Sequence, residues 1–285
     1  IGDCTNNMQN KHVSALAWVV SSPSLINHIA EGPAVIGSIK DSWIEHWLLS
    51  LDQNPTPLIQ HLSKEKSHFL GPYFEALWAF YLSSNPRYKV ISKNLQANSP
   101  TRTVGEFDFI LFDNENKNYI HQEIAIKFYL GFPQKNQYSF ADPDTLWIGP
   151  QSRDRLDLKM DKMVHSQAKL ASTQSGKEAL RSVGIDTDID PIKSEILVKG
   201  TLFYPWGMLM KPPSISHPNH LSGSWVKLKR LAEYLNSAPT DAWTLLTKPD
   251  WLGPGRIDNS SCSNTLFTHK HEAFEAIKTK VASEN

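Results

Sequence analysis

Acidic residues and a lysine lie in an otherwise apolar stretch, residues 103–131. Glu106 and Asp108 fall in its first half, and Glu123 and Lys127 fall in its second half. Like charges that face each other across strands destabilise a sheet, and a buried ion without a partner costs several kcal/mol. Such a cluster is tolerated if one carboxyl is protonated, if a cation lies among the carboxylates, or if they line a wet cleft.

A divalent cation is one way to offset this charge. Mg²⁺ suits a cluster of carboxylates that leaves coordination positions for water and for phosphate oxygens. The alternative is a half-exposed hairpin on which the same side chains face solvent. Spacing alone does not decide between these two interpretations.

The stretch predicts a β-hairpin. Residues 104–112 and 119–130 are rich in β-branched and aromatic side chains, and the turn between them is polar. Regular alternation places Asp108 on one face of the first strand and both Phe107 and Phe109 on the other. Both faces are apolar apart from the carboxylates, which is typical of a central strand that is covered on both sides.

Two further strands and two helices are expected around the hairpin. The pattern predicts strands of the same mixed sheet at 88–96 and 194–204, and helices at 72–83 and 154–171. The first helix is apolar on all sides except at Glu75, so it should be buried. The position of Glu75 near the helix start is explained equally well by the helix dipole and by a functional role.

Polar side chains on the second helix fall into two groups. Gln167 lies on the apolar stripe, where an amide is unexpected. Lys159, Lys162 and Lys169 lie on a different face. Contact with phosphate is one explanation for these lysines, but a solvated charged face is the commoner one.

The composition gives no strong electrostatic preference. The 285 residues include 29 Lys or Arg and 29 Asp or Glu, so the net charge is zero. This balance argues against a strong non-specific grip on nucleic acid, although it allows a local basic patch. The apolar run at 13–20 is too short to span a membrane. Cys4 and Cys262 form no metal-spaced motif, and a reducing, cytoplasmic location is expected.

We expect one α/β core with additions at both ends. Residues 1–70 predict a helical N-terminal extension, 71–210 the core, and 211–285 a mixed C-terminal elaboration packed on the core. Within these parts, 132–153 and 211–224 are expected to be loops, because they are polar and contain several prolines.

The hairpin resembles the core of the PD-(D/E)XK nuclease superfamily. The resemblance rests on Glu106 and Asp108 in a Gly-Glu-x-Asp sequence on one strand, followed by a turn and by Glu123 and Lys127 on the next. It implies a restriction-endonuclease-like mixed sheet flanked by helices. It also implies that a bound metal ion and a lysine together activate water.

The same resemblance implies roles for individual residues. Asp108 and Glu123 would bind Mg²⁺ (or Mn²⁺), and Glu75 from the preceding helix would complete the metal site. Glu106 would support the site or orient water, and Gln167 would point at the site from the following helix. The carboxylates of Glu75, Asp108 and Glu123 are therefore expected to converge on one point.

The whole chain resembles a bacterial family, domain-of-unknown-function family 1853. The matching segments are LAWVVSSPSLI, LGPYFEALWAFYL, RTVGEFDFI, HQEIAIKFYLG, GPQSRDRLDLKMDKMVHSQ, LFYPWG and PDWLGP. They extend over nearly the full length of the chain. This family has no established activity, so the nuclease interpretation rests on the superfamily.

One spacing departs from the superfamily pattern. The superfamily has Glu-x-Lys, whereas this chain has Glu123-x-Ala125-x-Lys127, so Ala125 occupies the expected lysine position. On a regular strand Glu123 and Lys127 share a face but lie roughly 13 Å apart at Cα. Either a β-bulge brings them together or the lysine function has moved elsewhere.

These observations predict a divalent-metal-dependent phosphodiesterase, a nuclease acting on DNA or RNA. The chain has no HExxH, P-loop, GxGxxG or GxSxG motif. The alternative is a nuclease-like fold without catalysis that binds nucleic acid or a protein. The carboxylates favour the enzyme, whereas the displaced Lys127 and the zero net charge favour the alternative.

Overall fold

The structure is a computed structural model that describes residues 8–67, 69–133, 145–248, 250–253 and 265–283. Within these ranges the main sheet is seven-stranded, in the order β1-β6-β4-β3-β2, with β5 beside β4 and β7 beside β6. Its strands are β1 (Ala34–Val35), β2 (Tyr88–Asn98), β3 (Thr103–Asp113), β4 (Asn118–Pro133), β5 (Thr145–Ile148), β6 (Ile192–Pro205) and β7 (Leu221–Trp225). Strands β2, β3 and β4 are antiparallel neighbours, whereas β4 and β6 are parallel.

The centre of this sheet was predictable from the sequence. The expected hairpin is β3 with β4, and the expected strands at 88–96 and 194–204 are β2 and β6. The prediction of an α/β protein with a mixed sheet flanked by helices is therefore confirmed.

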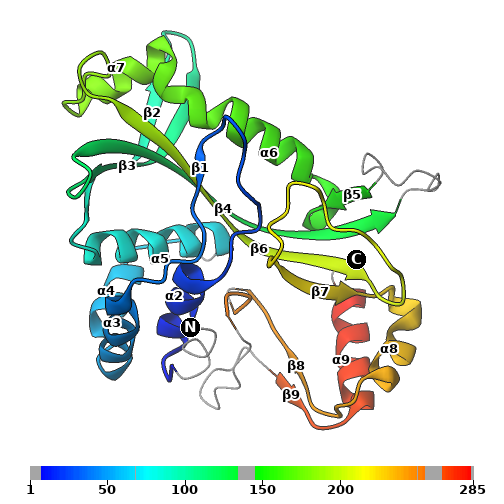
Figure 1. Cartoon of the computed structure of the whole chain (residues 1–285). Coiled ribbons are helices and arrows are strands. Elements are labelled where there is room, and N and C mark those ends of the chain that lie inside the picture. The colour runs from blue at the N-terminus through cyan, green and yellow to red at the C-terminus, as the bar shows by residue number, and fades with distance from the viewer. Residues whose placement is uncertain (1–7, 68, 134–144, 249, 254–264, 284–285) are drawn as a thin grey trace.

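Helices cover both faces of the sheet (Figure 1). One face carries α2 (Lys11–Ser21), α3 (Ser42–Gln53), α4 (Thr56–Leu62) and α5 (Leu70–Ser84), and the other carries α6 (Leu156–His165), a 3-10 helix (Gln167–Ser172) and α7 (Gln174–Ser182). Strand β4 is apolar on both faces because Ile120 and Ile124 pack on the α5 side, whereas Ala125 and Tyr129 pack on the α6 side. Burying both faces of a strand removes its apolar side chains from water on each side.

The N-terminal segment contributes a strand as well as helices. Helix α2 begins after Asn10, whose side chain accepts hydrogen bonds from the backbone N–H groups of His12 and Val13. Strand β1 then pairs in parallel with β6, with Ala34 opposite Glu195. Strand β1 has only two residues, which is too short for the alternation of a strand to show in the sequence. The sequence therefore predicts only helices in this segment.

Lys199 of β6 is fully buried beneath this N-terminal segment. Its Nζ donates hydrogen bonds to the backbone oxygens of Ser22 at 2.5 Å and of Gly37 at 3.2 Å. Burial lowers the pKa of Lys199 to about 7. One side chain thus holds the chain after α2 and the chain after β1 against the sheet.

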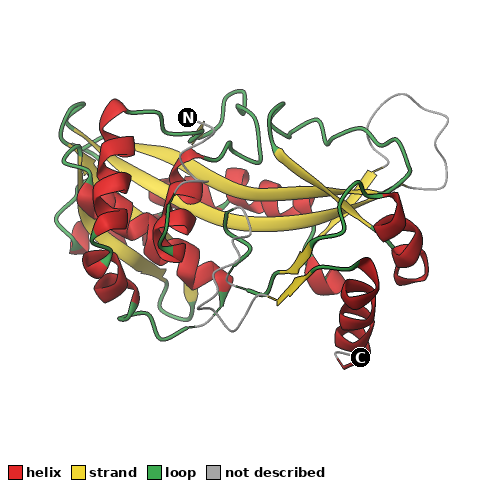
Figure 2. Cartoon of the chain, turned by 90° about the horizontal axis from the view of Figure 1, so that it is seen from below, coloured by secondary structure: helices red, strands yellow, loops and turns green. Residues whose placement is uncertain are grey.

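The C-terminal part lies beyond the end of the main sheet (Figure 2). It contains α8 (Leu231–Ser237), a two-stranded sheet of β8 (Trp243–Leu245) and β9 (Thr265–Phe267), and α9 (Lys270–Ser283). In Figure 2, α9 extends away from the sheet. Among the described residues, no helix combines the length and the apolar character needed to cross a bilayer.

Two segments predicted as loops contain short strands. The segment 211–224 leads into β7, which pairs with the far end of β6, and the segment 132–153 contains β5, which pairs with the far end of β4. Each of these short strands pairs with one end of a much longer strand. This pairing depends on tertiary contacts, which the local polarity of the sequence does not reveal. Residues 134–144, Cys4 and Cys262 lie outside the described residues.

The variant Lys199→Met tests the buried lysine through the pH dependence of unfolding. The folded-state pKa of about 7 lies below the ordinary value of 10.5. Between these values the unfolded chain binds more protons than the folded chain, so the free energy of unfolding should rise with pH. Urea unfolding across this pH range should show that Lys199→Met flattens the rise.

Lys193→Met is the matched control, because Lys193 lies on the same strand and is exposed. This control should retain the slope of the parent. Equal slopes in Lys193→Met and Lys199→Met would contradict a lowered pKa at Lys199.

Candidate functional site

The hydrogen-bond ladder between β3 and β4 ends halfway along the two strands. The last paired residues are Phe109 and Gln122. Beyond them the Asp108 side chain acts as the acceptor, because its Oδ2 accepts a hydrogen bond from the Ile124 backbone N–H at 2.8 Å. The Asp108 carboxylate is thereby held at the point where β3 and β4 separate.

Strand β3 also reverses its faces at Asp108. Phe109 packs with the α5-side core, whereas Phe107 packs with the α7-side core, so the prediction that both share a face is wrong. The register of β2 and β3 places Asn94 opposite Asp108, and Asn94 has a left-handed φ of 54°. Asparagine tolerates this left-handed conformation better than most residues. The conformation breaks the alternation of side chains between the two faces that a regular strand would keep.

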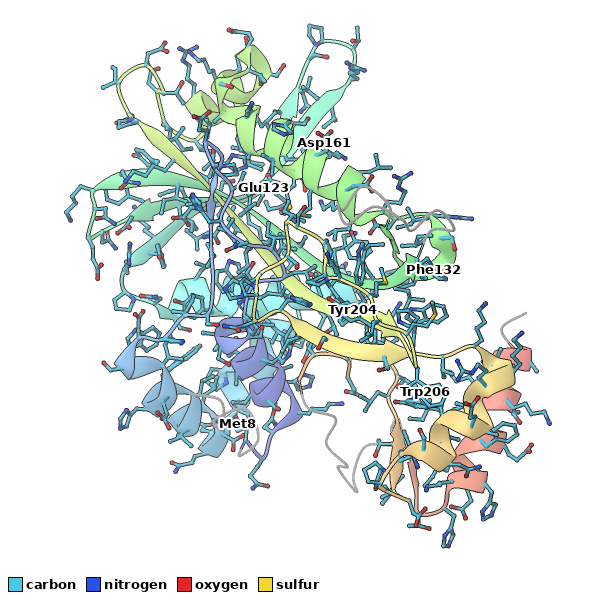
Figure 3. The ribbon with its side chains drawn as sticks, turned by 45° about the vertical axis from the view of Figure 1, so that its right-hand side comes forward. Met8, Glu123, Phe132, Asp161, Tyr204 and Trp206 are labelled. Carbon is cyan, nitrogen blue, oxygen red and sulfur yellow. The ribbon has the colours of Figure 1, made fainter. Side chains whose placement is uncertain are left out.

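Glu123 is fully buried on β4, below α6 (Figure 3). Its Oε1 lies 2.7 Å from His121 Nε2, and its Oε2 accepts a hydrogen bond from Gln167 Nε2 at 2.6 Å. His121 is also fully buried, and its Nδ1 has no hydrogen-bond partner in the described part of the chain. Nε2 is the ring nitrogen that can donate to Glu123, because an ionised carboxylate oxygen only accepts hydrogen bonds.

The helix predicted at 154–171 is interrupted. Ser166 has non-helical dihedrals of −120° and −65°, so α6 ends at His165 and a 3-10 helix begins at Gln167. This break directs the Gln167 amide to Glu123 instead of into the apolar stripe. Gln167, the polar residue on the apolar stripe, is thus a hydrogen-bond donor to the buried carboxylate of Glu123.

Lys159 is the residue that sequence reasoning misplaced. It is half-buried rather than solvated, and its Nζ donates to Gln167 Oε1 at 3.2 Å. Its charge acts on both Asp108 and Glu123. A signal was present, since Lys159 comes three residues after Leu156 and four before Met163, which places it on the apolar stripe.

The pKa of Asp108 is raised to about 7. Burial is the largest cause, the charge of Glu123 comes next, and the Ile124 N–H acts in the opposite direction. Burial likewise lowers the pKa of Lys159, with the charge of Lys127 as the second cause. Two adjacent carboxylates and one ammonium leave a negative charge that a proton or a cation must offset.

Glu75 and Glu106 are not part of this hydrogen-bonded group. Glu75 Oε1 accepts from Lys93 Nζ at 3.0 Å and from Asn94 Nδ2 at 2.9 Å, although its charge also raises the pKa of Asp108. Glu106 is half-buried opposite Gln96 of β2, and no hydrogen bond within the described residues joins it to Asp108.

Lys127 faces α6 but is held by another residue. Its Nζ lies 2.5 Å from Asp154 Oδ2, and Asp154 Oδ1 also accepts from the Tyr129 hydroxyl at 3.4 Å. Strand β4 pairs with β6 without a register shift from Tyr119 to Leu130, so no bulge in this pairing brings Lys127 to Glu123. The spacing of Glu123 and Lys127 on β4 is therefore that of a regularly paired strand.

The donor set fits a divalent ion only in part. Within the described ranges, no group of three or more His, Cys, Asp and Glu side chains is arranged to hold a metal ion, so the expected convergence of Glu75 with Asp108 and Glu123 is not seen. Mg²⁺ commonly uses one or two carboxylates and completes its shell with water and phosphate oxygens. Asp108 and Glu123 match that smaller requirement, and their unbalanced charge favours a cation.

These elements define an α/β protein whose sheet carries a fully buried Glu123 and a half-buried Asp108, with a lysine from α6 and an amide from the 3-10 helix that follows it. The chain matches the family described as "Domain of unknown function (DUF1853)" over residues 14–282, and it belongs to that family. No curated protein and no solved structure matches the chain.

The variant Asp108→Asn tests the charge conflict in the absence of metal. Because the folded-state pKa of about 7 exceeds the ordinary value of 3.8, the folded chain binds more protons in this range, and ionisation of Asp108 lowers stability as pH rises through it. Asparagine keeps an acceptor for the Ile124 amide but does not ionise. Chemical denaturation should therefore show Asp108→Asn at least as stable as the parent above neutral pH.

Asp161→Asn, an exposed change on α6 (Figure 3), is the control and should leave the pH profile of the parent unchanged. A large loss of stability in Asp108→Asn at every pH would show that the carboxylate stabilises the apo fold, contrary to this account.

Proposed function

We propose that this protein is a divalent-metal-dependent phosphodiesterase that cleaves nucleic acid. The observation that carries the proposal is the charge balance at Asp108 and Glu123, where two adjacent carboxylates share one nearby ammonium, that of Lys159. A pKa perturbed by burial and by a like charge is common at functional sites. Mg²⁺ or Mn²⁺ would relieve the repulsion and bring positive charge to a phosphate.

The hydrogen bonds around the carboxylates support a metal-binding role. The Ile124 amide orients Asp108, while Gln167 and His121 each occupy one oxygen of Glu123. Each carboxylate oxygen has a further lone pair, so these contacts orient Glu123 and leave sites for an ion. When bound, the ion would supply a water of lowered pKa and charge beside the scissile phosphate.

Lys159 would take the role of the lysine that the superfamily pattern has at the position of Ala125, instead of Lys127. Burial lowers the pKa of Lys159, so its ammonium gives up a proton more readily than an exposed lysine. The neutral amine would accept a proton from the attacking water, and the ammonium would donate a hydrogen bond to a phosphate oxygen. Lys127, held by Asp154, would tie β4 to the segment just before α6.

The order of the elements supports a PD-(D/E)XK-like fold. Helix α5 precedes the β3–β4 hairpin and α6 follows it, and the two helices lie on opposite faces of the sheet (Figure 1). Asp108 and Glu123 come from the two strands of the hairpin, and Gln167 comes from the segment after α6. These positions agree with the resemblance for Asp108, Glu123 and Gln167, but Glu75, the third expected ligand, is bonded to Lys93 and Asn94 instead.

A nuclease-like fold that binds nucleic acid without cleaving it is the second candidate. The observation that favours it is the engagement of Glu75 by Lys93 and of Lys127 by Asp154. Two residues expected at the reaction centre are thus already in ion pairs. Binding to labelled DNA and RNA without metal-dependent cleavage would select this candidate.

Cleavage assays distinguish the two lysines. With Mg²⁺ or Mn²⁺ and labelled single- and double-stranded DNA and RNA, Lys159→Met should lower the cleavage rate by about 100-fold or more, as for loss of a general acid or base. Lys127→Met should lower it by less than about tenfold if Lys127 acts only through Asp154. The matched control Lys169→Met, exposed on the following 3-10 helix, should retain the parent rate. Equal losses at Lys127 and Lys159 would contradict the assignment.

Metal binding is tested separately from cleavage by thermal unfolding. An ion that binds only the folded chain raises the melting temperature by mass action. MgCl₂ or MnCl₂ should therefore raise the melting temperature of the parent, and Asp108→Asn should lose this response. The same rise in both proteins would mean that the ion binds elsewhere.

A further inference from the structure

A cavity lies apart from Asp108 and Glu123, between the main sheet and the C-terminal part. Its volume is about 420 Å³. The described residues that line it are Phe128, Leu130, Pro150, Thr201, Phe203, Leu246 and Trp251. Small-molecule sites commonly have volumes of roughly 300–1,000 Å³ and mostly apolar walls.

The floor of this cavity is a rigid part of the sheet. Phe128 pairs with Thr201, and Leu130 pairs with Phe203, across the parallel strands β4 and β6. Phe128 packs with the α5-side core, whereas Tyr129, the next residue along β4, packs with the α6-side core. The cavity therefore opens on the face of the sheet opposite to the face that α6 covers.

The wall comes from the chain after β8. The Trp251 ring lies 5.3 Å from the Phe128 ring in an edge-on arrangement, and Trp251 Nε1 donates to the Leu246 oxygen at 3.3 Å. That bond satisfies the indole N–H, so the ring offers the cavity an apolar surface. Thr201 supplies the one side-chain hydroxyl among the described lining residues.

A positive charge stands beside this wall. Lys248 Nζ lies 4.8 Å from the centre of the Trp251 ring, and the Lys248 side chain is exposed. No ion pair to an acidic side chain is seen for Lys248 among the described residues. An apolar cavity next to an uncompensated ammonium is complementary to a ligand with an apolar body and one anionic end.

We propose that this cavity binds an amphiphilic carboxylate of the fatty-acid class. The hydrocarbon chain lies among Phe128, Phe203 and Trp251, and the carboxylate lies near Lys248. Each methylene that is removed from water favours binding, so a chain of medium length offsets the cost of ordering the ligand. The proposal does not depend on the nuclease function, because it involves other residues on the other face of the sheet.

A nucleobase fits this cavity less well. Aromatic rings can stack on bases, but the edge of a buried base carries donors and acceptors that need partners. Thr201 alone among the described lining side chains offers a hydroxyl, so most of those groups would remain unpaired. An alkyl chain has no such requirement.

Isothermal titration calorimetry of the full chain tests the proposal with decanoate below its critical micelle concentration and with decanol below its solubility limit in water. Decanoate should bind the parent saturably and more tightly than decanol. Lys248→Gln should weaken decanoate binding by about three- to fivefold, as for loss of an exposed ion pair, and should leave decanol binding unchanged. Lys229→Gln, an exposed lysine elsewhere, is the matched control and should change neither.

Leu246→Trp tests the location of the site by filling the cavity from its wall, and it should abolish binding of both ligands. A chain that melts cooperatively and still binds decanoate like the parent would place the ligand elsewhere and overturn the proposal. Absence of saturable decanoate binding to the parent would overturn it as well. Equal affinities for decanoate and decanol in the parent and in Lys248→Gln would overturn the assignment of a carboxylate ligand. Oligothymidylate binding that Leu246→Trp abolishes, without decanoate binding, would replace the proposal with a base-binding site.

Discussion

The hydrogen bond from the Ile124 amide to the Asp108 carboxylate is the interaction on which the centre of this structure depends. In a regular antiparallel pair that amide would be bonded by a backbone carbonyl of β3. Here the Asp108 side chain accepts that hydrogen bond instead, and β3 and β4 separate beyond Phe109. Asn94 on the neighbouring strand β2 is in the left-handed conformation at the same level. The opening between β3 and β4 gives Glu123 and Lys159 a common site with Asp108.

That arrangement costs stability in the apo protein. A carboxylate whose pKa is about 7 is ionised against the field of its neighbour above that pH. His121 and Gln167 hold the Glu123 carboxylate, and the Ile124 amide holds the Asp108 carboxylate, so rotation of either side chain would break a hydrogen bond. Functional sites commonly keep local conflicts that the rest of the fold tolerates, and a cation would remove this one.

The sequence predicts the scaffold better than the details of the site. Runs rich in apolar, β-branched and aromatic residues identify β3, β4 and β6, because covered central strands are apolar on both faces. The reversal at Asp108 depends on the backbone of Asn94 on another strand, so local alternation could not reveal it. Lys159 shows a different reason for a wrong prediction. Its charge indicated a solvated face, whereas its position on the apolar stripe indicated burial. The break at Ser166 is equally a tertiary effect, since no proline or glycine marks it.

A crystal soaked in MnCl₂ would show directly whether Asp108 and Glu123 hold a divalent ion beside Lys159. We expect an anomalous difference peak between the two carboxylates, at a distance of about 2.0–2.3 Å from an oxygen of each. Manganese only at other sites, with the Asp108 carboxylate still bonded to Ile124 and no peak beside it, would contradict a metal-binding role for the two carboxylates.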